Sequence, residues 1–138
     1  MKIKLVVPGK AQAKERPRLG KYGTYTPYKT KNYENWIKTI FIQNYPLMKP
    51  LESPLRVSII LNVDIPTSAS KKKQDEMRRG ILLPTKKPDV DNVAKSILDA
   101  LNKIAYRDDK QIIHLEVTKR YSDFTNAEII IEELEEMN

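Results

Sequence analysis

Hydrophobic and polar side chains follow two simple periods along most of this chain. Strict alternation predicts four strands, over residues 2–7, 55–63, 111–121 and 127–134. Only a short turn separates the last two strands, which favours an antiparallel hairpin. Apolar side chains at helical spacing predict two helices, over residues 30–44 and 90–104.

Two polar segments connect these elements. Residues 10–28 form a basic stretch with Gly and Pro, and loops of this length are typically functional or disordered. Residues 68–80 are basic as well and predict a short helix within a loop, with Ser70 as its N-cap. The element order indicates one domain over residues 1–138, an α/β (mixed α+β) fold in which helices pack on a small mixed sheet.

Composition narrows the chemistry that this domain can perform. Its 138 residues include no cysteine and one histidine, which excludes disulfides, thiolate zinc sites and cysteine nucleophiles. Any metal must therefore bind to oxygen ligands, as Mg²⁺, Mn²⁺ and Ca²⁺ do. Because no apolar run is long enough to span a bilayer and the first residues do not form a signal peptide, we expect a cytoplasmic protein without a membrane partner.

The charge is distributed unevenly along the chain. The formal net charge is +7, but residues 128–138 carry five Glu and no basic residue, so that 25 basic residues face 13 acidic ones in residues 1–127. A small domain this basic typically binds a polyanion, and nucleic acid fits better than a membrane surface because no helix is both basic and amphipathic.

Carboxylates concentrate around the second predicted helix. Asp91, Lys95 and Asp99 recur every four residues on its polar side, and Asp89 precedes the helix. The pair at 108–109 comes just before the next strand and could fold back beside them. Two carboxylates about 4 Å apart repel by roughly 1–4 kcal/mol, and a divalent cation is the natural counter-charge.

Each of these features also has a purely structural explanation. Aspartate is common at helix starts as a cap, Asp91 and Lys95 can form an ordinary helical ion pair, and the 108–109 pair can stabilise a turn. The lone histidine, His114, lies within a predicted strand, where a structural or surface role is expected.

The combined motif resembles that of RusA-type Holliday junction resolvases. The blocks that carry the resemblance are Asp89-Val90-Asp91-Asn92, Lys95, Asp99-Ala100-Leu101, Asp108-Asp109 and Gln111-Ile112. N-terminal blocks match in the same order, namely Pro8-Gly9-Lys10, Arg16-Pro17-Arg18, Tyr25-Thr26-Pro27 and Tyr33-Glu34. The resemblance extends over about residues 5–121 and excludes the lysines at 71–73 and the acidic tail.

The resemblance implies a homodimeric endonuclease that nicks four-way DNA junctions, is often encoded by prophages, and needs Mg²⁺ (or Mn²⁺) but no small-molecule cofactor. The family's catalytic residues fall here on Asp89, Asp91, Lys95 and Asp109. Its metal ligands fall on Asp89, Asp91 and Asp109, with Asp108 as an acidic neighbour.

Branched DNA is the expected partner, bound through phosphate contacts. The candidate contacts are Lys14, Arg16, Arg18, Lys21, Lys71, Lys72, Lys73, Lys86 and Lys87. Two alternatives remain at this point: a basic DNA-binding protein without catalysis, and a less selective metal-dependent nuclease that acts on forks and flaps.

Overall fold

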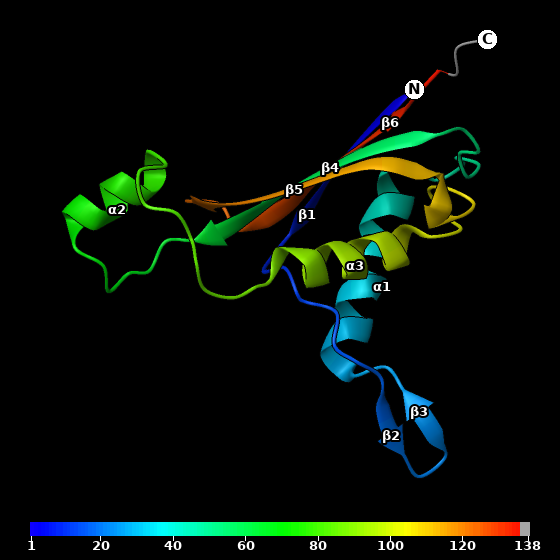
Figure 1. Ribbon diagram of the computed structural model, residues 1–138, viewed down its shortest axis with the longest axis horizontal. Helices are drawn as coiled ribbons and strands as arrows, with labels where there is room; N and C mark the ends of the chain where they lie inside the picture. The colour runs from blue at the N-terminus through cyan, green and yellow to red at the C-terminus, as the bar shows by residue number, and fades with distance from the viewer. Residues whose placement is uncertain (136–138) are drawn as a thin grey trace.

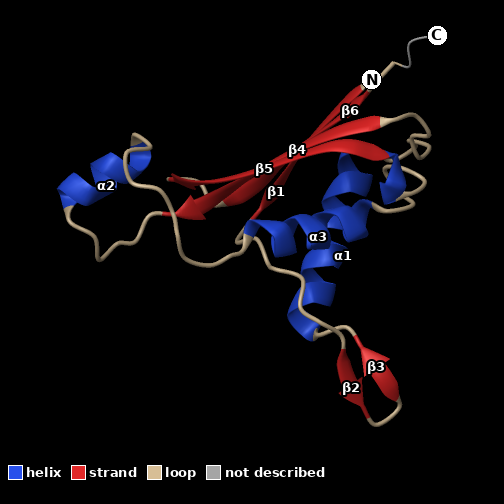
Figure 2. Ribbon diagram, in the orientation of Figure 1, coloured by secondary structure: helices blue, strands red, loops and turns tan. Residues whose placement is uncertain are grey.

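A four-stranded mixed sheet forms the body of the protein in a computed structural model that describes residues 1–135 (Figure 1). The strands are arranged in the order β1 (Lys2–Pro8), β6 (Asn126–Glu133), β4 (Leu55–Asp64) and β5 (Ile112–Ser122). Helices α1 (Tyr28–Asn44) and α3 (Val90–Leu101) lie against one face of this sheet (Figure 2). The predicted mixed α+β fold is confirmed.

The core lies between this sheet face and the two helices. Alternate strand residues such as Leu5, Ile59 and Ile129 are almost fully buried there, whereas their neighbours in sequence lie on the opposite face. The helices contribute their apolar sides, including Ile37 and Ile97, each 0% exposed. The period-two pattern of β1, β4 and β6 and the helical pattern thus place the core correctly, whereas Ile113 and Leu115 of β5 are exposed. Among residues 1–135, no helix is long and apolar enough to cross a membrane.

The predicted hairpin of the last two strands is wrong, because β5 and β6 lie on either side of β4. Strand β5 pairs in parallel with β4, and β6 pairs antiparallel with both β4 and β1. Helix α3 lies on the crossover between the parallel strands β4 and β5, as such a pair requires. Residues 123–125 connect β5 to β6 by passing the end of β4. The two strands are roughly 10 Å apart, a distance that three residues can span.

Two arms project from the body (Figure 1). The segment predicted as a loop contains a hairpin of β2 (Arg18–Gly20) and β3 (Gly23–Tyr25), where Gly23 has a φ of +113° that favours glycine. The other arm carries helix α2 (Lys71–Arg78), which has no buried residue. As predicted, the Ser70 side chain caps α2 by accepting a hydrogen bond from the Lys73 N–H at 3.2 Å.

Helix α3 ends three residues earlier than predicted. The chain turns at Lys103, which has a φ of +71°, and Tyr106 returns to the core. The Tyr106 hydroxyl donates a hydrogen bond to the Leu98 carbonyl at 2.6 Å. A 3₁₀ turn, η1 (Asp109–Gln111), leads into β5. The acidic segment 128–138 is mostly strand β6, and residues 136–138 lie outside the described part of the chain.

Candidate active site

The start of α3 is fixed by hydrogen bonds from a lysine on β5 and by the packing of the helix against the core. The Lys119 ammonium donates hydrogen bonds to the carbonyls of Lys86 and Pro88, the latter at 3.0 Å. The Asp89 carbonyl accepts the Val93 N–H at 3.1 Å, which begins the helix. Because Val93 is fully buried, the polar side of α3, with Asp91, is turned away from the core.

Asp89 and Asp91 show neither the side-chain cap nor the helical ion pair that a purely structural explanation predicts. Among the described residues, the Asp89 carboxylate makes no capping hydrogen bond to the helix backbone and accepts only a 3.3 Å hydrogen bond from the Asn92 side chain. No ion pair within 4.0 Å joins Asp91 to Lys95, although both lie in the described part of the chain. Since neither carboxylate is committed to a cap or a pair, both are available for ligands.

For Asp108 the structural explanation is correct. Its side chain accepts the Lys110 N–H at 2.9 Å, and its own N–H donates to the Gln111 side-chain oxygen at 2.9 Å, which completes a capping box. The Gln111 side-chain amide also donates to the carbonyls of Leu51 and Ser53, at 2.9 and 3.0 Å. The sequence motif contained Gln111, but its role as the anchor of this turn was missed.

An exposed hollow of about 410 Å³ lies beside α3 and brings candidate residues together from two elements. Asp91 and Lys95 reach it from α3, and Asp109 reaches it from the turn η1. Asp99, one helical turn beyond Lys95, lines it too. Its position on this side of the helix was predicted from the helical spacing, but no role was predicted for it. The remaining lining residues are Val90, Ala94, Leu98, Leu115 and Val117.

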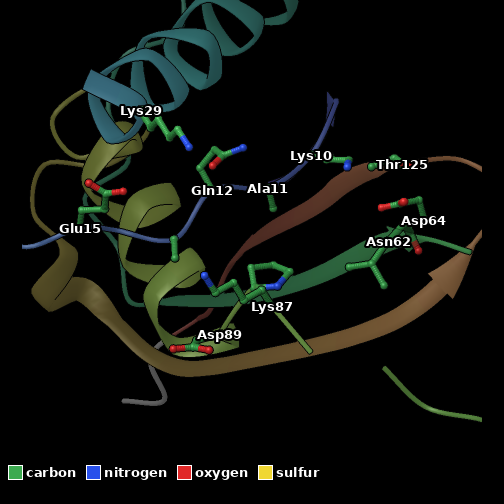
Figure 3. Close-up of a pocket in the computed structure, with 13 residues that line it drawn as sticks. Lys10, Ala11, Gln12, Glu15, Lys29, Asn62, Asp64, Lys87, Asp89 and Thr125 are labelled. Carbon is green, nitrogen blue, oxygen red and sulfur yellow. The ribbon is translucent and has the colours of Figure 1, made fainter. Parts of the chain in front are cut away.

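Asp89 faces a different hollow, of about 520 Å³, at the same end of α3 (Figure 3). There it lies with Lys87, and with Asn62 and Asp64 from β4. Within residues 1–135, no three histidine or carboxylate side chains are close enough to hold a metal ion jointly. The predicted meeting of three or four carboxylates in one group is therefore not seen there: Asp91 and Asp109 share one hollow, and Asp89 lines the other.

Negative charge accumulates around Asp109. The backbone N–H of Lys110 lowers the pKa of Asp108, which favours its ionised form. A side-chain hydrogen bond with Asp108, then burial, and then the charges of Asp108 and Asp99 raise the pKa of Asp109. A cation bound in this hollow would relieve that repulsion. Mg²⁺ typically binds proteins through one or two carboxylates plus waters and phosphates, so the donor set of Asp91 and Asp109 fits it.

Lys14 is not on the outer surface of the hairpin arm, where a DNA contact was expected. Its side chain is 19% exposed and its ammonium pairs with Glu34 on α1 and with Asp99 on α3, the latter at 3.2 Å. Its backbone N–H donates to the Asn92 carbonyl at 2.8 Å. Lys14 therefore ties the base of the arm to the helix that carries Asp91, a role that no local sequence signal indicated.

The other predicted DNA contacts remain at the surface. Arg16, Arg18 and Lys21 are exposed on the hairpin arm, where Arg18 lies 3.4 Å from the Glu15 carboxylate. The lysines at 71–73 are exposed on α2, and Lys86 and Lys87 are exposed before α3. His114 is exposed on β5, as expected for a surface residue.

Comparisons with known proteins agree with the motif. The family described as "Endodeoxyribonuclease RusA" matches residues 8–132, from the end of β1 to β6. "Uncharacterized protein YqaN" of Bacillus subtilis (strain 168) is 36% identical over 138 residues, and the match covers 96% of each chain. A match this extensive includes both hollows and every motif described above, and the chain belongs to the endodeoxyribonuclease RusA family.

Proposed function

We propose that this protein is a Mg²⁺-dependent endonuclease that resolves four-way DNA junctions by paired nicks. One observation carries the proposal: carboxylates from two separate elements, Asp91 and Asp109, line a single exposed hollow together with Lys95. The Asp91 carboxylate caps no helix and forms no ion pair within 4.0 Å among residues 1–135. Family membership supplies the reaction class, hydrolysis of a DNA strand.

The hollow suits phosphodiester hydrolysis. Water adds to the phosphorus, the bond from phosphorus to the leaving deoxyribose oxygen breaks, and the proton lost by the water is balanced by one gained on that oxygen. Asp91 and Asp109 would hold a divalent cation, with Asp89 in reach of the DNA from the neighbouring hollow. A bound cation lowers the pKa of the attacking water and neutralises phosphoryl oxygens. The Lys95 ammonium can stabilise the charge that develops on those oxygens.

Resolution of a junction also sets a requirement for symmetry. Two nicks in opposing strands need two sites, and each chain carries one set of Asp91, Lys95 and Asp109. A two-fold homodimer supplies the second site in the matching orientation. We therefore propose a homodimer as the active form.

Cleavage of defined DNA substrates tests this function. A synthetic four-way junction, a fork and a linear duplex of the same sequence are each incubated with the protein, with Mg²⁺ or with EDTA. We expect paired nicks in the junction that need Mg²⁺. Equal cleavage of all three substrates would instead support a less selective nuclease. Tight, salt-sensitive binding without any cleavage would support the non-catalytic DNA-binding alternative.

A further inference from the structure

A continuous groove leads from Trp36 to Asp89. The hollow that holds Asp89 shares Lys10, Gln12 and Lys29 with a third hollow, of about 410 Å³, that is lined by Trp36. We call the joined hollows the lysine groove. Figure 3 shows Lys29 at the start of α1, Gln12 on the segment after β1, and Asp89 before α3 around one opening.

Trp36 presents an aromatic surface at one end of this groove. Its side chain is 42% exposed, and its indole N–H donates a 2.8 Å hydrogen bond to the Pro8 carbonyl, which fixes the orientation of the ring. Exposed tryptophan faces are platforms on which nucleobases stack. The fixed ring would lose little entropy when a base binds.

The charge of the groove changes along its length. At the Trp36 end the only charged lining residues are Lys10 and Lys29, and neither forms an ion pair within residues 1–135. The Asp89 hollow, which Lys10 and Lys29 line as well, adds Lys87 and three acids, namely Glu15, Asp64 and Asp89. Phosphates are therefore attracted at the Trp36 end, and a strand that continues along the groove reaches Asp89.

We propose that the lysine groove binds an unpaired stretch of a DNA strand, with a base on Trp36 and neighbouring phosphates on Lys10 and Lys29. Each hollow has the volume of a small-molecule site, roughly 300–1,000 Å³, which is enough to admit a nucleotide. The inference rests on the proposed function in taking DNA as the ligand. It adds that the preferred substrate has unpaired nucleotides next to the strand that is cut.

Trp36 is the single tryptophan of the chain, so intrinsic fluorescence reports directly on the groove. Full-length protein is titrated in EDTA, where no cleavage occurs, with an oligothymidylate and with a duplex of the same length. We expect the oligothymidylate to quench the emission and the duplex to quench it far less. An unchanged emission at oligothymidylate concentrations that saturate binding, as followed by anisotropy, would overturn the proposal.

Matched substitutions distinguish DNA binding in the lysine groove from non-specific attraction of DNA to a basic surface. We expect Trp36→Leu to weaken binding of a labelled oligothymidylate by roughly 5- to 100-fold, as for loss of one stacked base, and Trp36→Phe to weaken it less. Lys29→Gln should weaken binding several-fold more than Lys31→Gln, an exposed control on the same helix. Equal effects of the two lysine variants would overturn the proposal.

The two proposals can fail separately. If the protein nicks no junction but Trp36 is quenched and Lys29→Gln differs from Lys31→Gln, the groove stands and the nuclease function fails. If junctions are nicked but Trp36 does not respond to unpaired DNA, the groove proposal fails alone.

Discussion

The two hollows that meet at the start of α3 differ in composition, although Asp89 and Asp91 are only two residues apart. The hollow with Asp91 is lined by three carboxylates, one lysine and aliphatic side chains from α3 and β5. The hollow with Asp89 opens into the lysine groove. The helix begins between the two aspartates, which turns their side chains to different surfaces. We therefore propose that this pair of aspartates serves two sites, one for a cation and one for a DNA strand.

Substitution of Asp91 should give the largest effect. We expect Asp91→Asn to reduce Mg²⁺-dependent junction nicking by about a thousandfold or more, because it removes a carboxylate donor from the hollow that we assign to the cation. Junction affinity measured in EDTA should stay within about threefold of the wild-type value, since few phosphate contacts change. Single-turnover cleavage measures the loss of nicking, and fluorescence anisotropy of a labelled junction measures the affinity.

The matched control for this substitution is Asp75→Asn on α2. Its carboxylate lies 3.6 Å from Arg79 in an exposed ion pair that contributes little to stability. Full cleavage by Asp91→Asn, or an equal loss in both variants, would contradict the assignment of Asp91 to the cation.

The neighbours Asp108 and Asp109 provide a sharper test of the same hollow. Asp109 faces the hollow, so Asp109→Asn should reduce nicking by at least about a hundredfold. Asp108 caps the turn, and asparagine caps as well as aspartate, so Asp108→Asn should cost less than about tenfold. The cleavage rates of the two variants are measured side by side. A larger loss for Asp108→Asn would mean that Asp108, and not Asp109, serves the cation site.

Asp89 should respond differently, because it lines the groove as well as flanking the site. We expect Asp89→Asn to lower junction nicking by tens of fold and to tighten oligothymidylate binding by about two- to fivefold, since a negative charge leaves the path of the phosphates. Asp91→Asn should leave oligothymidylate binding unchanged. Equal oligothymidylate affinity of the Asp89→Asn and Asp91→Asn variants would contradict the assignment of Asp89 to the DNA groove and of Asp91 to a separate hollow.

Local patterns predicted most elements of the fold but not how distant segments pair. Alternation located β4 and β6, and the apolar stripe located α3, because a buried face must be apolar. The same patterns suggested a β5–β6 hairpin because the two strands are close in sequence. Nothing in their local sequence indicates that β4 lies between them. The hairpin arm was missed because its short strands are almost wholly exposed and leave no alternating pattern.

For the candidate site, the sequence motif proposed residues but not their grouping. It named Asp89, Asp91 and Asp109 together, whereas the structure separates Asp89 from the other two. That separation depends on the residue at which α3 begins, and a boundary of this kind is seldom fixed by sequence. The ion pairs of Lys14 depend on three distant segments meeting, which no spacing along the chain encodes.

Substitution of Lys14, which ties the base of the hairpin arm to α3, should give the smallest effect, on stability rather than on chemistry. Lys14 belongs to the segment that borders the lysine groove, and it pairs with Asp99 in the other hollow. Lys14→Met leaves the half-buried Glu34 without its cation, at a cost of about 1–3 kcal/mol. The melting temperature should fall by several degrees. Lys31→Met, an exposed control on α1, should change it little.

The pH dependence identifies the ion pairs as the cause. Burial disfavours the charged form of Lys14, but its hydrogen bonds with Glu34 and Asp99 outweigh that effect and raise its pKa above the usual 10.5. A raised lysine pKa stabilises the fold fully below the unfolded value of 10.5, and this contribution is lost as the pH rises through the higher folded value. The difference in melting temperature between wild type and Lys14→Met should therefore be constant from neutral pH up to the ordinary lysine pKa and shrink above it. A difference that persists at higher pH would mean that packing, and not charge, joins the arm to α3.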